Sequence, residues 1–565
     1  MERVIMRSTP SMVRGIVAGG VAVAVAVGLV GAIAPTASAE IDPPSGTPAT
    51  VTADVLPTAQ VNGVVWSTAI VGGTVYAVGS FTKARPAGVA AGGKGEVTRN
   101  NALAFSLTTG KLLSWNPDLN AQARRVMASP NGDEIYVSGD FTAVGGVKRT
   151  RIAGFKTATG KLDTAFAPTI SGPGKALTVS ASTVYVGGGF ASASGQPRTK
   201  LAAFKRSNGA LTAWAPTTDD TVEALVVTGD KVVLGGRFHQ INGAKWRGVG
   251  AVDATTGASL PWNSRPEPND PPIKLPNNDG KLEQWTSWVT DLRVADGVVY
   301  GASNGQGAFP NTRTNMFDGR WAASASNGDL IWLDNCFGAT YGLTVVGKVL
   351  YSVGHAHDCS NLGAFPDTLP DTFYHGLAET TYATGKDKTG KGFQMNYANP
   401  PIPTLLHWFP KLAEGSYTGQ IQAAWTISST SKYIVMGGEF PSVGGVKQQG
   451  LVRFVVGSVA KKDVGPAKSD KLKPSAVGFV GRNVQVSWKT TSDVDDSTLT
   501  YSVYRDGGKT PVGTVTKASV PWKATSVSFT DKNVPTGQHT YTIKATDPHG
   551  NSVTGPEGGK VTVMF

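Results

Sequence analysis

The sequence predicts an all-β protein whose main part is a seven-bladed β-propeller of four-stranded blades, followed by a smaller β-sandwich. Three observations predict this fold. Glycine is abundant, at 70 of 565 residues, and charged residues make up only 16%. Short apolar runs that end in glycine recur along most of the chain. A repeat of such strand-like units at a spacing near fifty residues is typical of propellers and related arrays.

Seven glycine-ending runs mark the repeat. They are VYAVGSF from Val75, IYVSGDF from Ile135, VYVGGGF from Val184, VVLGGRF from Val232, VYGAS from Val299, LYSVGHA from Leu350 and IVMGGEF from Ile434. The first unit reads as four strands, VVWSTAIV, VYAVGSF, NALAF and KLLSW, separated by glycine turns and one loop. Seven four-stranded units close into a ring that leaves no long exposed edge.

Six aromatic residues end the last strand of successive units: Trp115, Phe166, Trp214, Trp262, Trp332 and Trp408. Because they recur in step with the repeat, we expect them to pack one unit against the next. The seventh unit lacks a clear fourth strand after Leu451–Val456. We expect residues 49–55, ATVTADV, to complete this unit by pairing with that strand.

The N-terminus is typical of a targeting segment. Arg3, Arg7 and Arg14 precede an apolar run over Gly15–Ala34, and an A-x-A site follows it. This pattern predicts a signal peptide over 1–39, and so a secreted or cell-surface protein; an uncleaved anchor is the alternative. No later stretch is apolar enough to span a membrane. In an exported chain the two cysteines, Cys336 and Cys359, predict a disulfide, with two unrelated thiols as the alternative.

The predicted organisation after the signal peptide is a propeller over 40–457, a Lys/Pro/Gly-rich linker over 458–473 and a second domain over 474–565. The second domain contains VQVSW ending at Trp488, LTYSVYRDG from Leu499 and TGQHTYTIKATDPHG from Thr536. It resembles a fibronectin type III domain, an immunoglobulin-like sandwich. The resemblance places Trp488 at the core tryptophan, Tyr501 at the central-strand tyrosine and Tyr541 at the tyrosine corner. In that family such domains are mostly spacers or adhesive units.

The repeats also resemble a family. The order GG-F, R-x-x-LA-F and TG-x-L-x-x-W/F-x-P is similar to the delta-sixty-type β-propeller repeat of exported bacterial proteins. The matching units are Val75–Pro117, Ile135–Pro168, Val184–Pro216 and Val232–Trp262, whereas the fifth and sixth units depart from the pattern. The resemblance implies the propeller but no particular activity. Kelch and quinoprotein repeats are weaker matches.

Loop lengths predict which face binds a ligand. The turns between first and second strands are short, whereas large insertions follow second strands or separate units: Lys83–Asn100, Asn263–Thr286, Gly305–Arg320 and Asp358–Tyr374. Insertions in repeat proteins gather on the binding face, although drift in loop length is an alternative. Both cysteines fall on this long-loop face.

Residues near the starts of the innermost strands are expected at the mouth of the central channel on this face. The predicted ligand-binding set is Trp66, Arg125, Lys175, Glu223, Trp288, Tyr341 and Trp425, with Thr290 in the same series. Aromatic and charged groups together suit a sugar, whose ring stacks on apolar faces. The alternative is that these side chains cap the core.

The sequence therefore predicts an exported or cell-surface binding protein for a glycan or other extracellular polymer, such as a cell-wall polymer. A polysaccharide-active hydrolase or lyase on the same face is the first alternative, but such an enzyme needs two suitably spaced carboxylates and no catalytic residue is identified. A quinoprotein or copper oxidase is the second.

We expect no cofactor, no metal site and no membrane contact beyond the signal segment. His355, His357 and Asp358 are weak metal candidates only. The charge of +12 is scattered without a dense basic run, which disfavours nucleic acid as a partner. The oligomeric state is left open.

Overall fold

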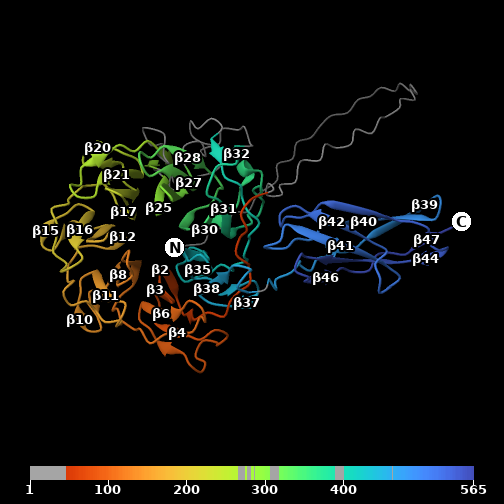
Figure 1. Ribbon diagram of the computed structural model, residues 1–565, viewed down its shortest axis with the longest axis horizontal. Coiled ribbons are helices and arrows are strands. Elements are labelled where there is room, and N and C mark those ends of the chain that lie inside the picture. The colour runs from red at the N-terminus through yellow and green to blue at the C-terminus, as the bar shows by residue number, and fades with distance from the viewer. Residues whose placement is uncertain are drawn as a thin grey trace, which may run out of the picture. The chain divides into compact units, whose positions relative to one another are not determined.

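The structure, a computed structural model, describes residues 46–264, 274–276, 282–284, 287–305, 317–387, 400–460 and 462–564 (Figure 1). These residues contain no α-helix, only the 3-10 turns η2 (Ser360–Leu362) and η3 (Asp470–Leu472). The prediction of an all-β protein is confirmed. Among these residues no helix has the length and apolar character needed to cross a membrane. The predicted signal peptide, 1–39, and most of the 263–286 insertion lie outside the described residues.

Seven antiparallel sheets follow one another along residues 64–455. In chain order they are β2 (Val64–Val71), β3 (Thr74–Ser80) and β6 (Ala102–Ser106); β7 (Ala123–Ala128), β8 (Glu134–Gly139) and β11 (Ile152–Lys156); β12 (Gly174–Val179), β13 (Thr183–Gly188) and β16 (Leu201–Lys205); β17 (Val222–Thr228), β18 (Lys231–Gly236), β21 (Val249–Asp253) and β22 (Ser259–Leu260); β25 (Ser287–Ala295), β26 (Val298–Gly305), β27 (Gly319–Ser324) and β28 (Leu330–Leu333); β29 (Thr340–Val346), β30 (Val349–Ala356) and β31 (Tyr374–Thr380); and β34 (Ala424–Ser429), β35 (Tyr433–Gly438) and β38 (Leu451–Val455). In every sheet the second strand is one of the seven glycine-ending runs.

The first strands of these sheets form a cycle of neighbours. Strand β2 packs on β7, β7 on β12, β12 on β17, β17 on β25, β25 on β29, β29 on β34, and β34 on β2 again. The described strands form no closed barrel, because each sheet keeps its own hydrogen-bonded ladder. Apolar side chains fill the space between neighbouring sheets; one such cluster joins Tyr76 and Ala104 of the first sheet to Val126 and Ile135 of the second.

The expectation of four strands in every unit is wrong for most sheets. Only the fourth and fifth sheets have a fourth strand, β22 and β28. Elsewhere the segment makes a single bridge, as between Phe105 and Leu112 or Phe204 and Leu211. The segment adds one further hydrogen bond to the third strand, as from the Leu113 N–H to Ala104 O at 2.8 Å, and is too short to form a strand.

The terminal aromatics join neighbouring sheets, as predicted. The indole N–H groups of four of them donate to a carbonyl oxygen of the next unit: Trp115 to Gly160 at 3.0 Å, Trp214 to Asp253 at 2.9 Å, Trp332 to Thr381 at 3.0 Å and Trp408 to Thr52 at 3.2 Å. Each ring also meets a tyrosine of its own sheet, as Trp214 meets Tyr185 at a centroid distance of 5.1 Å. These aromatic side chains therefore stabilise the contacts between neighbouring sheets.

The N-terminal segment pairs with the seventh sheet. The Thr52 N–H donates to Val455 O at 2.9 Å, and the Leu56 N–H donates to Arg453 O at 3.1 Å. Val51 and Ala53 are buried in the core of that sheet. The predicted pairing of residues 49–55 with Leu451–Val456 is confirmed, although it forms one bridge and separate hydrogen bonds rather than a continuous ladder.

The long loops carry short strands of their own. Their bounds are β1 (Gln60–Val61), β4 (Lys83–Arg85) and β5 (Val97–Thr98); β9 (Ala143–Val144) and β10 (Val147–Lys148); β14 (Ser192–Ala193) and β15 (Gln196–Pro197); β19 (Gln240–Ile241) and β20 (Ala244–Lys245); β23 (Lys274–Pro276) and β24 (Leu282–Gln284); β32 (Gly385–Lys386) and β33 (Pro401–Ile402); and β36 (Ser442–Val443) and β37 (Val446–Lys447). Bridges such as Leu119 to Val144 and Ile170 to Ala193 join a connection between sheets to the second-to-third-strand loop of the next sheet. These two kinds of segment thus share a face, as predicted. The disulfide between Cys336 and Cys359 joins the same kinds of segment.

Two larger sheets and one two-stranded sheet follow η3. One contains β39 (Ser475–Phe479), β40 (Asn483–Lys489) and β43 (Ser526–Asp531). The other contains β42 (Gly513–Ala518), β41 (Thr498–Arg505), β45 (Tyr541–Thr546) and β46 (Ser552–Thr554), and β44 (Gly537–His539) pairs with β47 (Val561–Val563). One hydrophobic core includes Trp488, Tyr501 and Tyr541. The Tyr541 hydroxyl lies 2.9 Å from Asp531 Oδ2, so its partner is a side chain rather than the backbone of a tyrosine corner.

Candidate binding cavity

A β-bulge lies at the same place in the first strand of all seven sheets. Each bulge inserts one residue opposite the C-terminal end of the second strand, and the pairing register shifts there. The inserted residues, in chain order, are Trp66, Arg124, Lys175, Glu223, Thr290, Tyr341 and Trp425. A bulge re-aims the extra side chain away from the ladder. Because the first strands form a cycle, all seven side chains meet around one centre.

These side chains surround a cavity of about 280 Å³. The lining consists of Trp66, Arg124, Arg125, Lys175, Glu223, Arg237, Trp288, Thr290, Asn304, Tyr341, Gln420 and Trp425. All seven residues of the predicted ligand-binding set therefore line one cavity. The alignment differs by one residue in the second sheet, where Arg124 occupies the bulge and Arg125 follows it.

One side of the cavity is aromatic. The Trp66 and Trp425 ring centroids lie 5.1 Å apart, and those of Tyr341 and Trp425 lie 4.3 Å apart. The Trp425 indole N–H donates to Glu439 Oε1 at 3.0 Å and thus fixes the ring. Burial raises the pKa of the Tyr341 hydroxyl, so this group stays a neutral hydrogen-bond donor. The three rings form a continuous apolar surface that is half-buried.

The facing side is charged. Lys175 Nζ lies 2.8 Å from Glu223 Oε1, and Arg237 Nε lies 3.3 Å from the same oxygen. The Arg237 guanidinium carbon also lies 3.7 Å from the centroid of Trp288, a cation–π contact. Lys175 and Glu223 remain partly open, with side-chain exposures of 33% and 16%. This side therefore presents both donors and acceptors to the cavity.

Arg125 also lines the cavity, and its side chain bonds to residues of neighbouring sheets. Its guanidinium donates to Lys175 O at 3.2 Å, Glu223 O at 3.4 Å and Thr290 O at 3.1 Å, and it pairs with Asp291 Oδ1 at 3.2 Å. These partners come from three other sheets. Arg125 therefore holds first strands together, whereas Arg124 lines the cavity and pairs with the partly exposed Asp140.

Sequence reasoning missed Arg124, Arg237, Asn304 and Gln420 in the lining. Arg237 and Asn304 occupy one repeat position, directly after the glycine end of the second strand. In the other units this position holds Ser80, Asp140, Gly189, His355 or Glu439. The sequence did contain a signal for this position, because its residue type varies between units while the surrounding GG-F pattern stays regular. Gln420 lies in a connection between sheets, for which the repeat offers no register.

The weak metal candidates do not form one ligand set among the described residues. Both ring nitrogens of His355 are engaged: the Ala339 N–H donates to Nε2 at 3.2 Å, and the Gln422 side-chain amide lies 2.7 Å from Nδ1. His357 Nδ1 lies 3.0 Å from Asp367 Oδ1, and Asp358 Oδ1 accepts the Ser360 N–H. Burial lowers the pKa of His355 to about 4.

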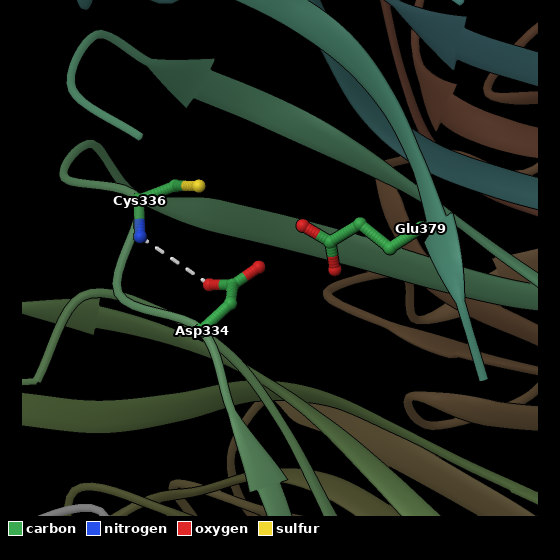
Figure 2. Close-up of side chains that lie close together, drawn as sticks. All are labelled: Asp334, Cys336 and Glu379. Carbon is green, nitrogen blue, oxygen red and sulfur yellow. Dashed lines mark hydrogen bonds between the residues drawn. The ribbon is translucent and has the colours of Figure 1, made fainter. Parts of the chain in front are cut away.

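A second group with metal-like spacing lies beside the disulfide. Figure 2 shows the carboxylates of Asp334 and Glu379 turned toward each other near Cys336, whose N–H donates to Asp334 Oδ1 at 3.3 Å. The Arg320 guanidinium already pairs with both carboxylates. The Cys336 sulfur is committed to Cys359. This group is a buried ion cluster that joins the fifth and sixth sheets.

Comparison with known proteins gives little further guidance. No protein-family model and no curated protein matches the chain. Among solved structures, the chain is similar to the computationally designed Ika8 protein, with 11% identity over 72% of this chain and all of that one, at a TM-score of 0.36. It is also similar to the designed Ika4 protein, with 14% identity over 32% of this chain and 91% of that one, at a TM-score of 0.23. Neither likeness supports an argument about function.

Proposed function

We propose that the chain is an exported seven-bladed β-propeller with a C-terminal fibronectin type III domain, and that it binds a glycan through the cavity at the centre of the propeller. The cycle of seven first strands supports the propeller. The shared core around Trp488 supports the sandwich. The signal peptide predicted from the sequence supports a secreted or cell-surface location, where cell-wall and other extracellular glycans are the available polymers.

One observation carries the binding proposal: seven repeat units place their bulge residues around one cavity, with an aromatic side opposite a charged side. A sugar ring offers apolar C–H faces for Trp66, Tyr341 and Trp425, and hydroxyls for Lys175 and Glu223. The cavity volume of about 280 Å³ lies at the lower end of small-molecule sites. We therefore propose that the cavity takes a single terminal or side-branch sugar rather than a segment inside a long chain.

The other functions considered have less support. A glycosidase needs two carboxylates that flank the scissile bond, and Glu223 is the one carboxylate in the described lining. It is paired with Lys175 and Arg237. A galactose-oxidase-like site needs a free cysteine, and Cys336 and Cys359 are both in the disulfide. We therefore propose binding without turnover.

A glycan array probed with the full chain tests this proposal. We expect binding to glycans that share one terminal sugar, and no release of reducing ends on prolonged incubation. The Trp425→Ala variant should bind about fivefold more weakly, since one stacking contact contributes on the order of 1 kcal/mol. Phe479→Ala is the matched control, because Phe479 is exposed on β39, outside the cavity lining. Release of reducing sugars would favour the hydrolase, and equal binding by both variants would remove the cavity from the proposal.

A further inference from the structure

Four aspartates gather at one end of the β41–β45 pair. Asp493, Asp495 and Asp496 lie in the loop between β40 and β41. Thr500 of β41 pairs with Thr546 of β45, so the residues that enter β41 lie beside Asp547, which directly follows β45. Ligand oxygens of Asp493, Asp496 and Asp547 all lie within 4.8 Å of one another. The loop and the strand register therefore hold three carboxylates around one point.

These carboxylates are buried. The exposed fractions are 1% for Asp493, 5% for Asp495, 8% for Asp496 and 5% for Asp547. Asp493 Oδ2, Asp495 Oδ1 and Asp496 Oδ2 have no hydrogen-bond partner among the residues that the structure describes. Buried carboxylates are costly unless they are paired or coordinate a cation. Three unpartnered oxygens lie on three side chains of one loop, and no described hydrogen bond offsets the free-energy cost of burying them.

Hydrogen bonds from nearby groups hold the carboxylates of Asp493, Asp495 and Asp547 in place. Asp493 Oδ1 accepts the Val494 N–H at 2.6 Å, and Asp495 Oδ2 accepts the Ala53 N–H at 2.8 Å. Both Asp547 oxygens accept hydrogen bonds from Asn551, through its backbone N–H and its side-chain amide. These hydrogen bonds thus fix the carboxylates in position without a bound ligand.

The cations nearby do not balance this charge. Lys462 Nζ lies 3.4 Å from Asp496 Oδ1, and His549 Nε2 lies 3.6 Å from the same oxygen. Both contacts fall on Oδ1 and leave Asp496 Oδ2 free. Lys462 and His549 contact only one of the four carboxylates, so the other three have no cationic side chain paired with them among the ion pairs of the described residues.

We propose that Asp493, Asp496 and Asp547, with Asp495, bind a calcium ion. The ligands are all hard oxygens, and they come from an irregular loop and a strand end, which suits the flexible six- to eight-oxygen coordination of Ca²⁺. Mg²⁺ demands a near-ideal octahedron and gives up its waters reluctantly, so it fits less well. This site is separate from the central cavity and does not depend on glycan binding.

The test is the thermal unfolding of the full chain in chelator and in millimolar calcium, together with calorimetric titration of calcium. We expect one equivalent of calcium to bind and the Tm to rise by roughly 5 °C or more, with a smaller rise in magnesium. The Asp496→Asn variant should lose most of the calcium response. In chelator it should unfold at a temperature equal to or above that of the wild type, because one repulsive charge is gone. A purely structural role for Asp496 would instead lower the Tm in chelator.

Asp470→Asn is the matched control, since Asp470 is exposed in the same part of the chain; it should keep the full calcium response. Asp493→Asn is the second variant, used if Asp496→Asn does not fold. Identical wild-type unfolding curves in chelator and calcium, with no titration heat, would overturn the proposal. A full calcium response in either cluster variant would overturn it as well.

Discussion

His355 lies next to the aromatic side of the cavity, with its ring centroid 6.0 Å from that of Tyr341. Burial lowers the pKa of His355 from 6.5 to about 4, so the folded protein prefers the neutral imidazole. The unfolded chain binds a proton at higher pH than the folded chain does. The stabilisation is therefore complete above pH 6.5 and is lost as the pH falls toward 4.

Because of His355, we expect the free energy of unfolding of the wild type to depend on pH in a way that the His355→Gln variant does not. We expect the free energy of unfolding of the wild type, relative to the variant, to fall by about 3 kcal/mol between pH 7 and pH 4. Urea unfolding of both proteins across this range provides the measurement. A constant difference between the two proteins would show that His355 titrates in the folded state as it does in water.

The cluster of Arg320, Asp334 and Glu379 is the most deeply buried ion network described, with exposures of 1%, 0% and 1%. Burial raises the pKa of Glu379 well above its usual range. Arg320 Nε donates to Asp334 Oδ2 at 2.6 Å, and the same guanidinium pairs with Glu379 of the sixth sheet. We expect the loss of any one member of this network to destabilise the fold strongly, because its partners would stay buried without a counter-charge.

Replacing Arg320 by methionine should destabilise the protein by about 3–5 kcal/mol, because two buried acidic groups lose the cation and the hydrogen bonds that pair with them. Chemical denaturation measures the loss. The matched control is Arg124→Met at the half-exposed pair with Asp140, where we expect less than about 1 kcal/mol. Similar losses in the two variants would mean that burial does not govern the strength of these pairs.

At the scale of the sheet, the terminal aromatics show how one unit is joined to the next. The Trp214 indole N–H reaches Asp253 O in the following sheet, whereas the second sheet has Phe166 at the equivalent position and makes no such bond. A phenylalanine therefore occupies this position at one boundary of the cycle. The tryptophan adds a hydrogen bond and buried area to one boundary of the cycle.

We expect Trp214→Phe to cost about 1–2 kcal/mol, from a lost hydrogen bond and a smaller buried ring. The variant should keep its secondary structure, which circular dichroism would check alongside thermal unfolding. An unchanged stability of the Trp214→Phe variant would mean that the sheets are held together mainly by the apolar side chains between them.

The disulfide belongs to the same scale, since it ties the segment after β28 to the loop after β30. Closing a loop of this length contributes about 3 kcal/mol through the unfolded state. The Cys336→Ser, Cys359→Ser double variant should lose about that much stability. Unfolding the wild type in reductant should reproduce the loss, and an unchanged Tm in both experiments would contradict the estimate.

Sequence reasoning located the second strands because glycine, aromatic and β-branched residues mark them in every unit. The series that it aligned near the starts of the first strands coincides with six of the seven bulge residues, although it did not predict the bulges themselves. Arg124 was missed because the bulge carries two adjacent arginines, and composition does not tell which one is inserted. The fourth strands were over-predicted, because in most sheets that segment makes only a single bridge, as between Phe105 and Leu112. The aspartate cluster had no sequence signal strong enough to notice, because its members meet only through the β41–β45 register.

At the scale of the whole molecule, the cycle of first strands explains why one cavity collects a residue from every sheet. No single unit contains a site; Trp66 comes from the first sheet, Glu223 from the fourth and Trp425 from the seventh. The pairing of Thr52 with Val455 joins the two ends of this cycle. Chemical variety at the cavity therefore arises from substitutions at two positions per repeat while the strands around them stay regular.

The most direct test of the cavity as the binding site is a crystal structure of the chain with the glycan that the array selects. We predict density for one sugar ring in the cavity, with an apolar face on Trp425 or Trp66 and hydroxyls near Lys175 and Glu223. An intact glycan bound only on the outer surface, with the cavity filled by water, would contradict the account.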